Sequence, residues 1–512
     1  MTPVSTLQIF LFCILGVNPI FSFSPLDTRY TKKKKNHVSL SATASNKSNN
    51  KEHSPYLQDM KNKRAYPQQT PHAGRHFRPS HPHHAPSKLS QRFNRLKRHP
   101  QRTKTKRFME GWYYRLTIPE SNVSFAFIFS IEDPFESELS LSCVQVMGPN
   151  DEYVVQAEPS HEKFWAFAHS QSFGCVFDYD KDAMIASSKI EKDDVLEVLD
   201  PDDFEKYVKA GFQMLPTRLQ GKVKGHDGSL GGVLENQGIP RTCDFDVQIT
   251  PLSGWGDDDQ DLEKSRQKST AGWLASYSVF EPHWQVTLAD ARATGYATWN
   301  GTRYDFENVP FYAEKNWGGS FPSKWYWVQC NSFQGFTSQD GSNRLSLTAG
   351  GGIRKVPFGG TEDLGMVCIH YNGVFYEAVP WTGDMEWEVD PWGSWKFSAK
   401  CTSGKRLFEV DVVATCEEDG VVLRAPTQDL GMVYFCRDSF FANVELSLYE
   451  LDWDKDKKEY VRGHAILENV KSIERTGAVE IGGGPYWNPW KGKSKMKSFL
   501  KSLVKLPYLF GK

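Results

Sequence analysis

The sequence predicts an all-β protein with two antiparallel β-barrel or β-sandwich domains, a disordered presequence before them and a short amphipathic helix after them. Short runs of β-branched and aromatic residues alternate with Gly, Pro, Asn and Asp from residue 108 onward. Helical periodicity is weak except at 201–210 and near the carboxyl terminus. The length of 512 residues leaves room for two all-β units of roughly 200 to 250 residues each.

Charge is divided unevenly along the chain. Residues 1–110 hold 21 Lys and Arg against 4 Asp and Glu, a net charge of +17, and the remaining 40 basic and 58 acidic residues give −18. A fold that binds nucleic acid needs a basic face to neutralise phosphates. The acidic body therefore argues against nucleic acid as a partner.

The first 70 residues have the composition of a targeting signal. The apolar stretch within 1–23 is too short to span a bilayer and is typical of a signal peptide, so we expect its removal. Residues 24–70 are rich in Ser and Lys and poor in acids, like a disordered transit segment. The junction FSP at 23–25 resembles the two-part presequences of algae with a secondary plastid. A plain secretory protein is the alternative, but nine cysteines without a C-x-x-C pair argue against it.

The body carries runs of four to eight residues with turn signals between them, as antiparallel strands do. The predicted strands lie at 112–118, 124–131, 153–156, 245–249, 284–288, 325–330, 345–348 and 366–370.

Two pairs of similar segments within the sequence suggest two related domains. FMEGWYY at 108–114 resembles FPSKWYW at 321–327, and TPLSGWG at 250–256 resembles VDPWGSW at 389–395. The offsets differ, because Trp112 and Trp325 are 213 residues apart whereas Trp255 and Trp392 are 137 apart. We place the N-terminal domain at 71–309, with a basic, His- and Pro-rich insert at 78–107, and the C-terminal domain at 310–492.

The last segment, 493–512, is predicted to be a basic amphipathic tail. Met496, Phe499, Leu500 and Leu503 fall on one helical stripe, and lysines lie around it. Such a helix suits an anionic lipid surface. A helix that docks on the barrel is the alternative.

The sequence motifs of several common enzyme classes are absent. The sequence has no G-x-x-x-x-G-K-[ST], no G-x-G-x-x-G after a strand, no H-E-x-x-H and no G-x-S-x-G, so we predict no nucleotide cofactor and no metal. The glycine runs at 350–352 and 482–484 follow strand-like segments without the Lys of a phosphate loop. We therefore expect them to form bends or to allow close approach to the backbone.

Two stretches, FEPHWQ at 280–285 and YAEKNWGG at 312–319, place an acid close to Trp. A carboxyl on an apolar wall has a raised pKa and can donate a proton near neutral pH, and indole faces stabilise cations. A carboxyl group with a raised pKa and aromatic faces that stabilise a cation are nearly all that the protonation of an alkene requires. The structural alternative is that Glu314 pairs with Lys315 or Arg303 and that His283 is a core histidine.

A set of motifs in fixed order resembles the tocopherol cyclase family of plastids, over about four fifths of the chain. They are PHAGRHF at 71–77, FMEGWYY at 108–114, IPE at 118–120, KSTAGW at 268–273, VFEPHWQ at 279–285, EKNWGG at 314–319, KWYWVQC at 324–330, LTAGGG at 347–352, RAPT at 424–427, CRDS at 436–439 and VEIGGGP at 479–485.

The resemblance implies a cofactor-independent isomerase of the intramolecular lyase type with a lipocalin-like, two-domain architecture. Its substrates would be the lipids 2-methyl-6-phytyl- and 2,3-dimethyl-6-phytyl-1,4-benzoquinol, closed to chromanols at a thylakoid or plastoglobule surface. A more distant likeness is to carotenoid hydratases, whose Tyr-x-Asp pair corresponds to Tyr312 and Glu314. The insert at 78–107 and the divergent final helix depart from the land-plant pattern and leave membrane attachment and targeting open.

On this basis Glu314 is the predicted acid inside an aromatic-lined barrel cavity, with Tyr312 as its orienting partner. Glu281 and His283 are the second acid/base candidates. A lipocalin-like carrier that binds prenylquinones without converting them is the alternative function. The predicted substrate-binding residues are Trp112, Tyr113, Trp284, Asn316, Trp317, Trp325 and Trp327.

Because a signal-like stretch precedes an acid-poor segment, residues 1–60 should direct a fluorescent fusion into the plastid and be absent from the mature protein. Fluorescence microscopy and N-terminal sequencing would check this. A fusion that is secreted into the medium would contradict it.

Overall fold

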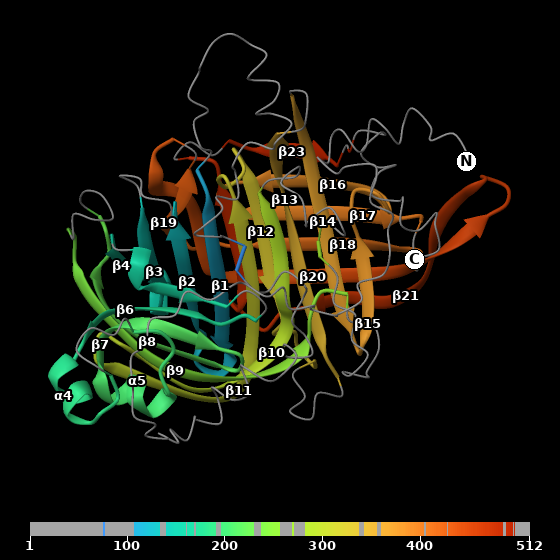
Figure 1. Ribbon diagram of the computed structural model, residues 1–512. Helices are drawn as coiled ribbons and strands as arrows, with labels where there is room; N and C mark the ends of the chain where they lie inside the picture. Colours follow the sequence, from blue (N-terminus) through green and yellow to red (C-terminus); the bar gives the residue numbers. More distant parts are fainter. Residues whose placement is uncertain are drawn as a thin grey trace, which may run out of the picture. The chain divides into compact units, whose positions relative to one another are not determined.

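A computed structural model describes residues 75–76, 107–133, 140–159, 161–167, 170–190, 196–229, 237–256, 269–270, 282–336, 343–355, 360–403, 406–427, 429–484, 488–494 and 496. Within these residues the predicted all-β class is confirmed: the strands form two large antiparallel sheets (Figure 1). All eight segments predicted as strands from their β-branched and aromatic residues lie in strands.

The first sheet has eleven strands in the order β4-β3-β2-β1-β11-β10-β9-β8-β7-β6-β5. Val155 of β4 also pairs with His226 of β8, so the sheet curls back on itself. Its strands are β1 (Met109–Ile118), β2 (Val123–Glu132), β3 (Leu141–Met147), β4 (Tyr153–Glu158), β5 (Phe164–Ala166), β6 (Phe173–Tyr179), β7 (Val208–Leu215), β8 (Arg218–His226), β9 (Pro240–Ser253), β10 (His283–Trp299) and β11 (Thr302–Gly318).

The second sheet has twelve strands, ten of them in the order β15-β14-β13-β12-β22-β20-β18-β17-β16-β23, while β19 and β21 both pair with β20. Its strands are β12 (Trp325–Cys330), β13 (Leu345–Lys355), β14 (Thr361–Tyr371), β15 (Val374–Ala378), β16 (Gly383–Asp390), β17 (Ser394–Cys401), β18 (Phe408–Thr415), β19 (Val421–Thr427), β20 (Gly431–Asp454), β21 (Glu459–Lys471), β22 (Gly477–Gly482) and β23 (Trp490–Lys493).

Helices are short in the described residues. The predicted helical segment at 201–210 forms α5 (Pro201–Tyr207), and the chain enters β7 at Val208. The others are η1 (Pro119–Ser121), η2 (Pro149–Asp151), η3 (His161–Lys163) and α4 (Lys181–Ala186). No helix of the described residues is long and apolar enough to cross a membrane.

Side chains alternate between two environments along the central strands. Phe311 and Ala313 of β11 lie in the core enclosed by the first sheet, whereas Tyr312 lies in a separate cluster to which both sheets contribute. In β12, Tyr326 lies in the core of the second sheet and Trp327 joins the shared cluster. Because successive residues of a strand face opposite sides, each of these strands fills its own core and also contacts the other sheet.

Buried polar contacts join the two sheets. The guanidinium of Arg115 in β1 donates to Gln329 Oε1 at 2.5 Å and to the backbone oxygen of Thr476 at 2.7 Å. The carboxylate of Asp151 accepts from Ser439 Oγ at 2.6 Å and from the backbone N–H of Phe440. These bonds satisfy polar groups that would otherwise be buried without partners, and they fix how the sheets meet.

The predicted domain boundary near Val309 needs correction. Val309 and Pro310 lie inside β11, which belongs to the first sheet up to Gly318, and the second sheet begins at Trp325. The strands that carry Trp112 and Trp325 occupy corresponding places in the two sheets, although Trp112 lies in the core of the first sheet and Trp325 in the shared cluster. In each sheet the strand that carries this Trp pairs with the next strand in sequence and with one near the end of its own half.

Two other boundaries also change. Arg107, placed in the basic insert, is buried and pairs with Glu132. Lys493, placed at the start of the basic tail, ends β23, and the backbone N–H of Ser494 donates to Met385 O at 2.8 Å. The remaining predictions for the presequence, the insert and the amphipathic tail fall outside the described residues, apart from Ser494 and Met496.

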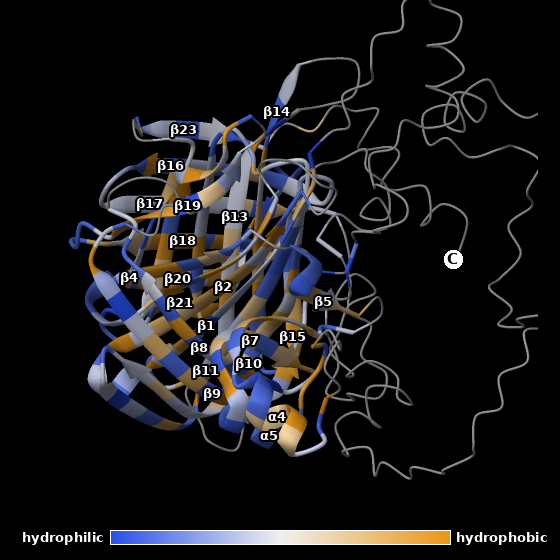
Figure 2. Ribbon diagram, turned by 60° about the vertical axis from the view of Figure 1, so that its left-hand side comes forward, coloured by the Kyte–Doolittle hydropathy of each residue, from blue (hydrophilic) through white to orange (hydrophobic). Residues whose placement is uncertain are grey.

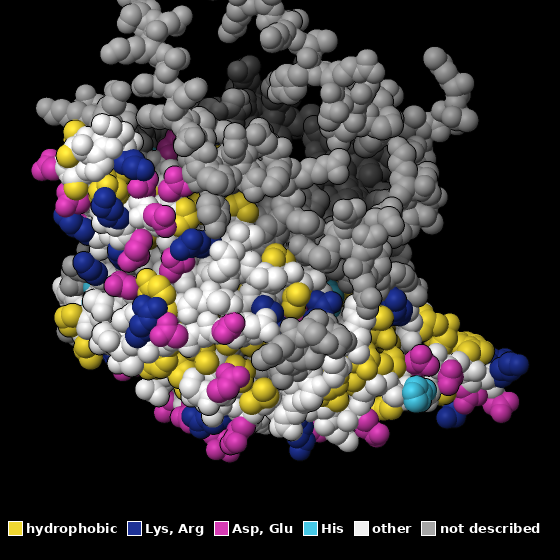
Figure 3. Space-filling view, turned by 90° about the horizontal axis from the view of Figure 1, so that it is seen from below, with side chains coloured by type: hydrophobic (Ala, Val, Ile, Leu, Met, Phe, Trp, Pro, Cys, Tyr) yellow, Lys and Arg dark blue, Asp and Glu magenta, His cyan; other side chains and the backbone are white. Residues whose placement is uncertain are grey.

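The distribution of polar side chains and the state of the cysteines agree with the composition of the sequence. Hydrophobic and hydrophilic residues alternate along the strands (Figure 2), and acidic and basic side chains are interspersed on the face shown in Figure 3. All eight cysteines in the described part of the chain are buried and free of disulfides.

Candidate active site

A cavity of about 230 Å³ is lined by residues of both sheets. The sequence placed the site inside one barrel, but the cavity lies where the two sheets face each other. Tyr113, Trp325 and Trp327 of the shared cluster line it. Trp112 and Phe129 from the core of the first sheet and Tyr326 from the core of the second also reach it. Its aromatic wall consists of Trp112, Tyr113, Phe129, Trp284, Phe321, Trp325, Tyr326, Trp327 and Trp381.

Glu314 lies in this wall with its carboxyl group held by three donors. The hydroxyl of Tyr312 donates to Oε2 at 2.7 Å, and the indole N–H of Trp284 donates to the same oxygen at 2.8 Å. The amide of Asn316 donates to Oε1 at 3.3 Å. Residues 312, 314 and 316 share one face of β11, and Trp284 projects from the neighbouring strand β10, so the period of two brings them together.

The carboxyl group of Glu314 is an acid with an unusually high pKa. Burial disfavours its ionised form and, with the nearby charge of Glu480, raises the pKa from 4.5 to about 7, although the bonds from Tyr312, Trp284 and Asn316 oppose the shift. A substantial fraction of Glu314 is therefore protonated at neutral pH.

The structural alternative for Glu314 is wrong. Lys315 projects to the opposite face of β11, where its Nζ lies 2.6 Å from Glu110 Oε1. Arg303 pairs with Asp305 at the surface. No ion pair between Glu314 and a basic side chain occurs among the described residues.

Lys315 belongs to a buried ion cluster behind the cavity wall. It pairs with Glu110, and the ring Nδ1 of His76 lies 3.4 Å from the same carboxylate oxygen. Despite burial, the charges of Lys315 and His76 hold the pKa of Glu110 at about 2. The ring of His76 stacks on Trp317 at 4.0 Å. These contacts tie the segment at 75–76 to the first sheet.

Six of the predicted substrate-binding residues line the cavity, namely Trp112, Tyr113, Trp284, Asn316, Trp325 and Trp327. Trp317 does not line it; this residue follows Asn316 on the strand and lies in the core of the first sheet, stacked between His76 and His283. Of the second acid/base pair, His283 reaches the cavity lining and stacks on Trp317 at 4.9 Å, whereas Glu281 lies outside the described residues.

Two glycines leave room for the indoles that hold the acids. A Cβ on Gly350 would meet the Trp284 ring at 3.1 Å, and a Cβ on Gly482 would clash with the Trp325 ring. The expectation that both glycine runs allow close approach to the backbone is confirmed at these positions.

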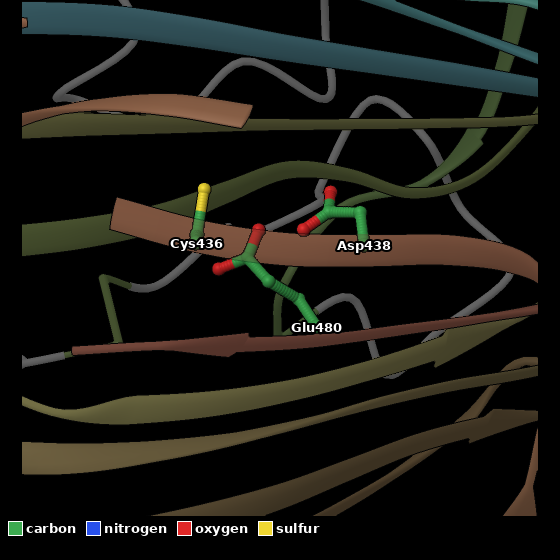
Figure 4. A group of neighbouring side chains, drawn as sticks. All are labelled: Cys436, Asp438 and Glu480. Carbon is green, nitrogen blue, oxygen red and sulfur yellow. The ribbon is translucent and has the colours of Figure 1, made fainter. Parts of the chain in front are cut away.

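A second polar cluster, of two acids and a cysteine, was not predicted from the sequence. Cys436, Asp438 and Glu480 project toward one another from β20 and β22 (Figure 4). One potential ligand atom from each lies within 4.8 Å of the others. Glu480 lines the cavity and accepts a hydrogen bond from the indole N–H of Trp325. The sequence signal that could have pointed to Glu480 was an acidic residue within the otherwise hydrophobic strand pattern at 477–482.

Comparison with known proteins identifies relatives over most of the chain. The "Tocopherol cyclase-like" family model matches residues 106–483. A Zea mays protein named "Tocopherol cyclase, chloroplastic" is 37% identical over 414 residues, which is 78% of this chain and 80% of that protein. An Oryza sativa subsp. japonica protein named "Probable tocopherol cyclase, chloroplastic" is 36% identical over 411 residues, again 78% and 80%.

A solved structure, that of CghA, superposes with a TM-score of 0.38 and 9% identity, covering 74% of this chain and 90% of CghA. A likeness at this level adds nothing to the description of the fold.

The raised pKa of Glu314 predicts a pH-dependent cost in stability. Its pKa is about 7 in the folded protein and 4.5 as the reference for the unfolded chain, so stability present below pH 4.5 is lost as pH rises through 7. Glu314→Gln, which cannot ionise, should therefore gain roughly 3 kcal/mol relative to the natural protein between pH 4 and pH 8.

Denaturant unfolding at both pH values measures this difference. Glu307→Gln is the matched control, because Glu307 lies on the same strand with an exposed side chain, and its relative stability should change little. An equal pH dependence in Glu314→Gln and the natural protein would contradict the raised pKa.

Proposed function

The chain belongs to the tocopherol cyclase-like family, and from this we propose that it is a tocopherol cyclase, an enzyme that closes the chromanol ring of prenylated benzoquinols. The substrates would be 2-methyl-6-phytyl- and 2,3-dimethyl-6-phytyl-1,4-benzoquinol. The single observation that carries the mechanism is the buried carboxyl of Glu314, partly protonated at neutral pH and facing an aromatic cavity.

The first step would be proton transfer from Glu314 to the side-chain alkene. Oε2 accepts two short hydrogen bonds, from Tyr312 and Trp284, whereas Oε1 accepts one longer bond from Asn316, so the acidic proton belongs on Oε1. Tyr312 and Trp284 also stabilise the carboxylate that remains, which helps the proton leave. Tyr312 thus orients the acid and does not replace it.

The tertiary cation formed in this way needs stabilisation until the ring closes. Trp284, Trp325 and Trp327 line the cavity, and their ring faces carry the negative quadrupole that attracts a cation. The phenolic oxygen then attacks the cationic carbon. The reaction is an isomerisation without a change in oxidation state, so we propose an intramolecular lyase that works without a cofactor.

We propose a plastid location, with peripheral attachment to thylakoid or plastoglobule lipid. The two relatives named chloroplastic support the compartment, and the targeting composition of residues 1–70 agrees with it. For attachment, the support is the pattern of Lys497, Lys501 and Lys505 around Phe499 and Leu503.

Incubation of the purified protein with either quinol, without nucleotide or added metal, should yield the chromanol on chromatography. Glu314→Gln should lower turnover by roughly 10²-fold or more while quinol binding stays near normal, because the amide keeps the shape but supplies no acid. Tyr312→Phe should lose less. Natural turnover in Glu314→Gln would move the assignment to His283 and Glu281, and binding without any chromanol would favour the carrier.

Removal of residues 497–512, which leaves β23 intact, should weaken binding to vesicles of anionic lipid, most strongly at low salt. Vesicle co-sedimentation measures this, and a thermal melt serves as the control because folding should persist. Loss of the cooperative melt would show that the tail is instead needed for the fold.

A further inference from the structure

A second acid faces the cavity from the sheet opposite Glu314. Glu314 projects from β11 of the first sheet, whereas Glu480 projects from β22 of the second, and both line the same cavity. Each accepts the indole N–H of a cavity tryptophan: Trp284 bonds Glu314, and Trp325 bonds Glu480. A substrate between the two walls would therefore have one carboxyl group on each side.

Glu480 is paired with a buried partner. Asp438 is its register partner on β20 and is 1% exposed (Figure 4). No hydrogen-bond partner among the described residues reaches either oxygen of Asp438 in its ionised form. Asp438 is buried and Glu480 is half-buried, and two such carboxylates that face each other without a cation between them cannot both hold a charge. One of the pair must carry a proton.

The proton belongs on Asp438. Burial and the charge of Glu480 raise the pKa of Asp438 well above its ordinary range. Burial also raises the pKa of Glu480, but the hydrogen bonds from Trp325 and from protonated Asp438 oppose that rise. Glu480 is thus the member that carries the negative charge and can accept a proton.

A buried hydroxyl in the cavity marks a place for a polar group of the ligand. Tyr113 is 8% exposed and lines the cavity, and its hydroxyl has no hydrogen-bond partner among the described residues. Tyr113 is the register partner of Glu314, and its ring contacts Trp327, the register partner of Glu480, at 5.4 Å. A hydroxyl of the quinol is the group that would satisfy Tyr113 between the two acids.

Ring closure takes up one proton and releases another. Glu314 gives a proton to one alkene carbon, and the π electrons form that C–H bond. A lone pair of the phenolic oxygen then forms the C–O bond, and the O–H bond must break. An oxygen that becomes a positively charged ether is strongly acidic, so a carboxylate is a sufficient base.

We propose that Glu480 is the base that takes the phenolic proton as the ring closes, held in position by Asp438 and Trp325. This rests on the proposed cyclase function. The enzyme resets when one proton passes from Glu480 back to Glu314 through solvent, so no oxidant, reductant or co-reactant is consumed.

The test is turnover of 2-methyl-6-phytyl-1,4-benzoquinol in D₂O with two readouts, the chromanol and deuterium bound to side-chain carbon in the recovered quinol. Glu480→Gln should lower chromanol formation by about 10²-fold. Deuterium should still enter the side chain, because the cation forms and then loses a proton to regenerate an alkene. Glu314→Gln should give neither product.

Three outcomes would overturn the assignment. They are natural chromanol formation by Glu480→Gln, loss of both readouts in that variant, and loss of natural turnover on dialysis against EDTA with recovery on adding a divalent metal. The last would make Cys436, Asp438 and Glu480 a cation site. If the natural protein forms no chromanol at all, the proposed function itself fails, which is a separate result.

Two further variants address folding and the role of Asp438. Asp438→Asn should raise the ratio of side-chain deuterium to chromanol less than Glu480→Gln does, because an amide N–H can still hold Glu480; an unchanged ratio would contradict its positioning role. If Glu480→Gln gives no cooperative melt, Trp325→Phe removes the N–H on Glu480 and should raise the same ratio, and an unchanged ratio there would overturn the proposal. Glu468→Gln, at an exposed position of β21, is the control with natural values.

Discussion

The alternation of side chains along strands buried on both faces is the constraint on which the rest of the structure depends. In β11, Phe311 and Ala313 fill the core of the first sheet, while Tyr312 and Glu314 face the second sheet. β1 and β12 divide their side chains in the same way. Much of the wall between the sheets is therefore built from side chains that point away from the two cores, and a shift of one residue would replace Glu314 with Lys315.

Burial of carboxyl groups between the two sheets changes their pKa values, and these affect both the stability of the fold and the chemistry of the cavity. Removal from water raises the pKa of Glu314 to about 7, and donors from Tyr312 and Trp284 keep the group from being buried without partners. Burial also raises the pKa values of Asp438 and Glu480. Because the two carboxyl groups lie close together, they cannot both be charged, so Asp438 keeps a proton while Glu480 is ionised. Behind the wall, Glu110 is equally buried but stays ionised because Lys315 and His76 surround it. Neighbouring charge, more than burial, thus decides which acid keeps its proton.

Much of the fold and half of the site could be predicted from sequence because they depend on local patterns. Aromatic and β-branched runs identified the strands, and an acid next to Trp identified Glu314 and Trp284. The prediction failed where a residue's role depends on distant partners. Glu480 lies in an ordinary strand pattern, and its partner Trp325 is 155 positions away. Trp317 was assigned to the cavity by its nearness to Glu314, although alternation turns it into the core. The domain boundary was placed between residues 309 and 310, yet β11 continues through it.

The central claim is that Glu314 holds a proton near neutral pH inside the cavity between the sheets. An infrared difference spectrum between the natural protein and Glu314→Gln, titrated with pH in the absence of substrate, tests it most directly. The account predicts a protonated carboxyl band that disappears with a midpoint near pH 7 and gives way to carboxylate bands. A midpoint at the ordinary value of 4.5 would contradict it, because a carboxylate cannot protonate an alkene.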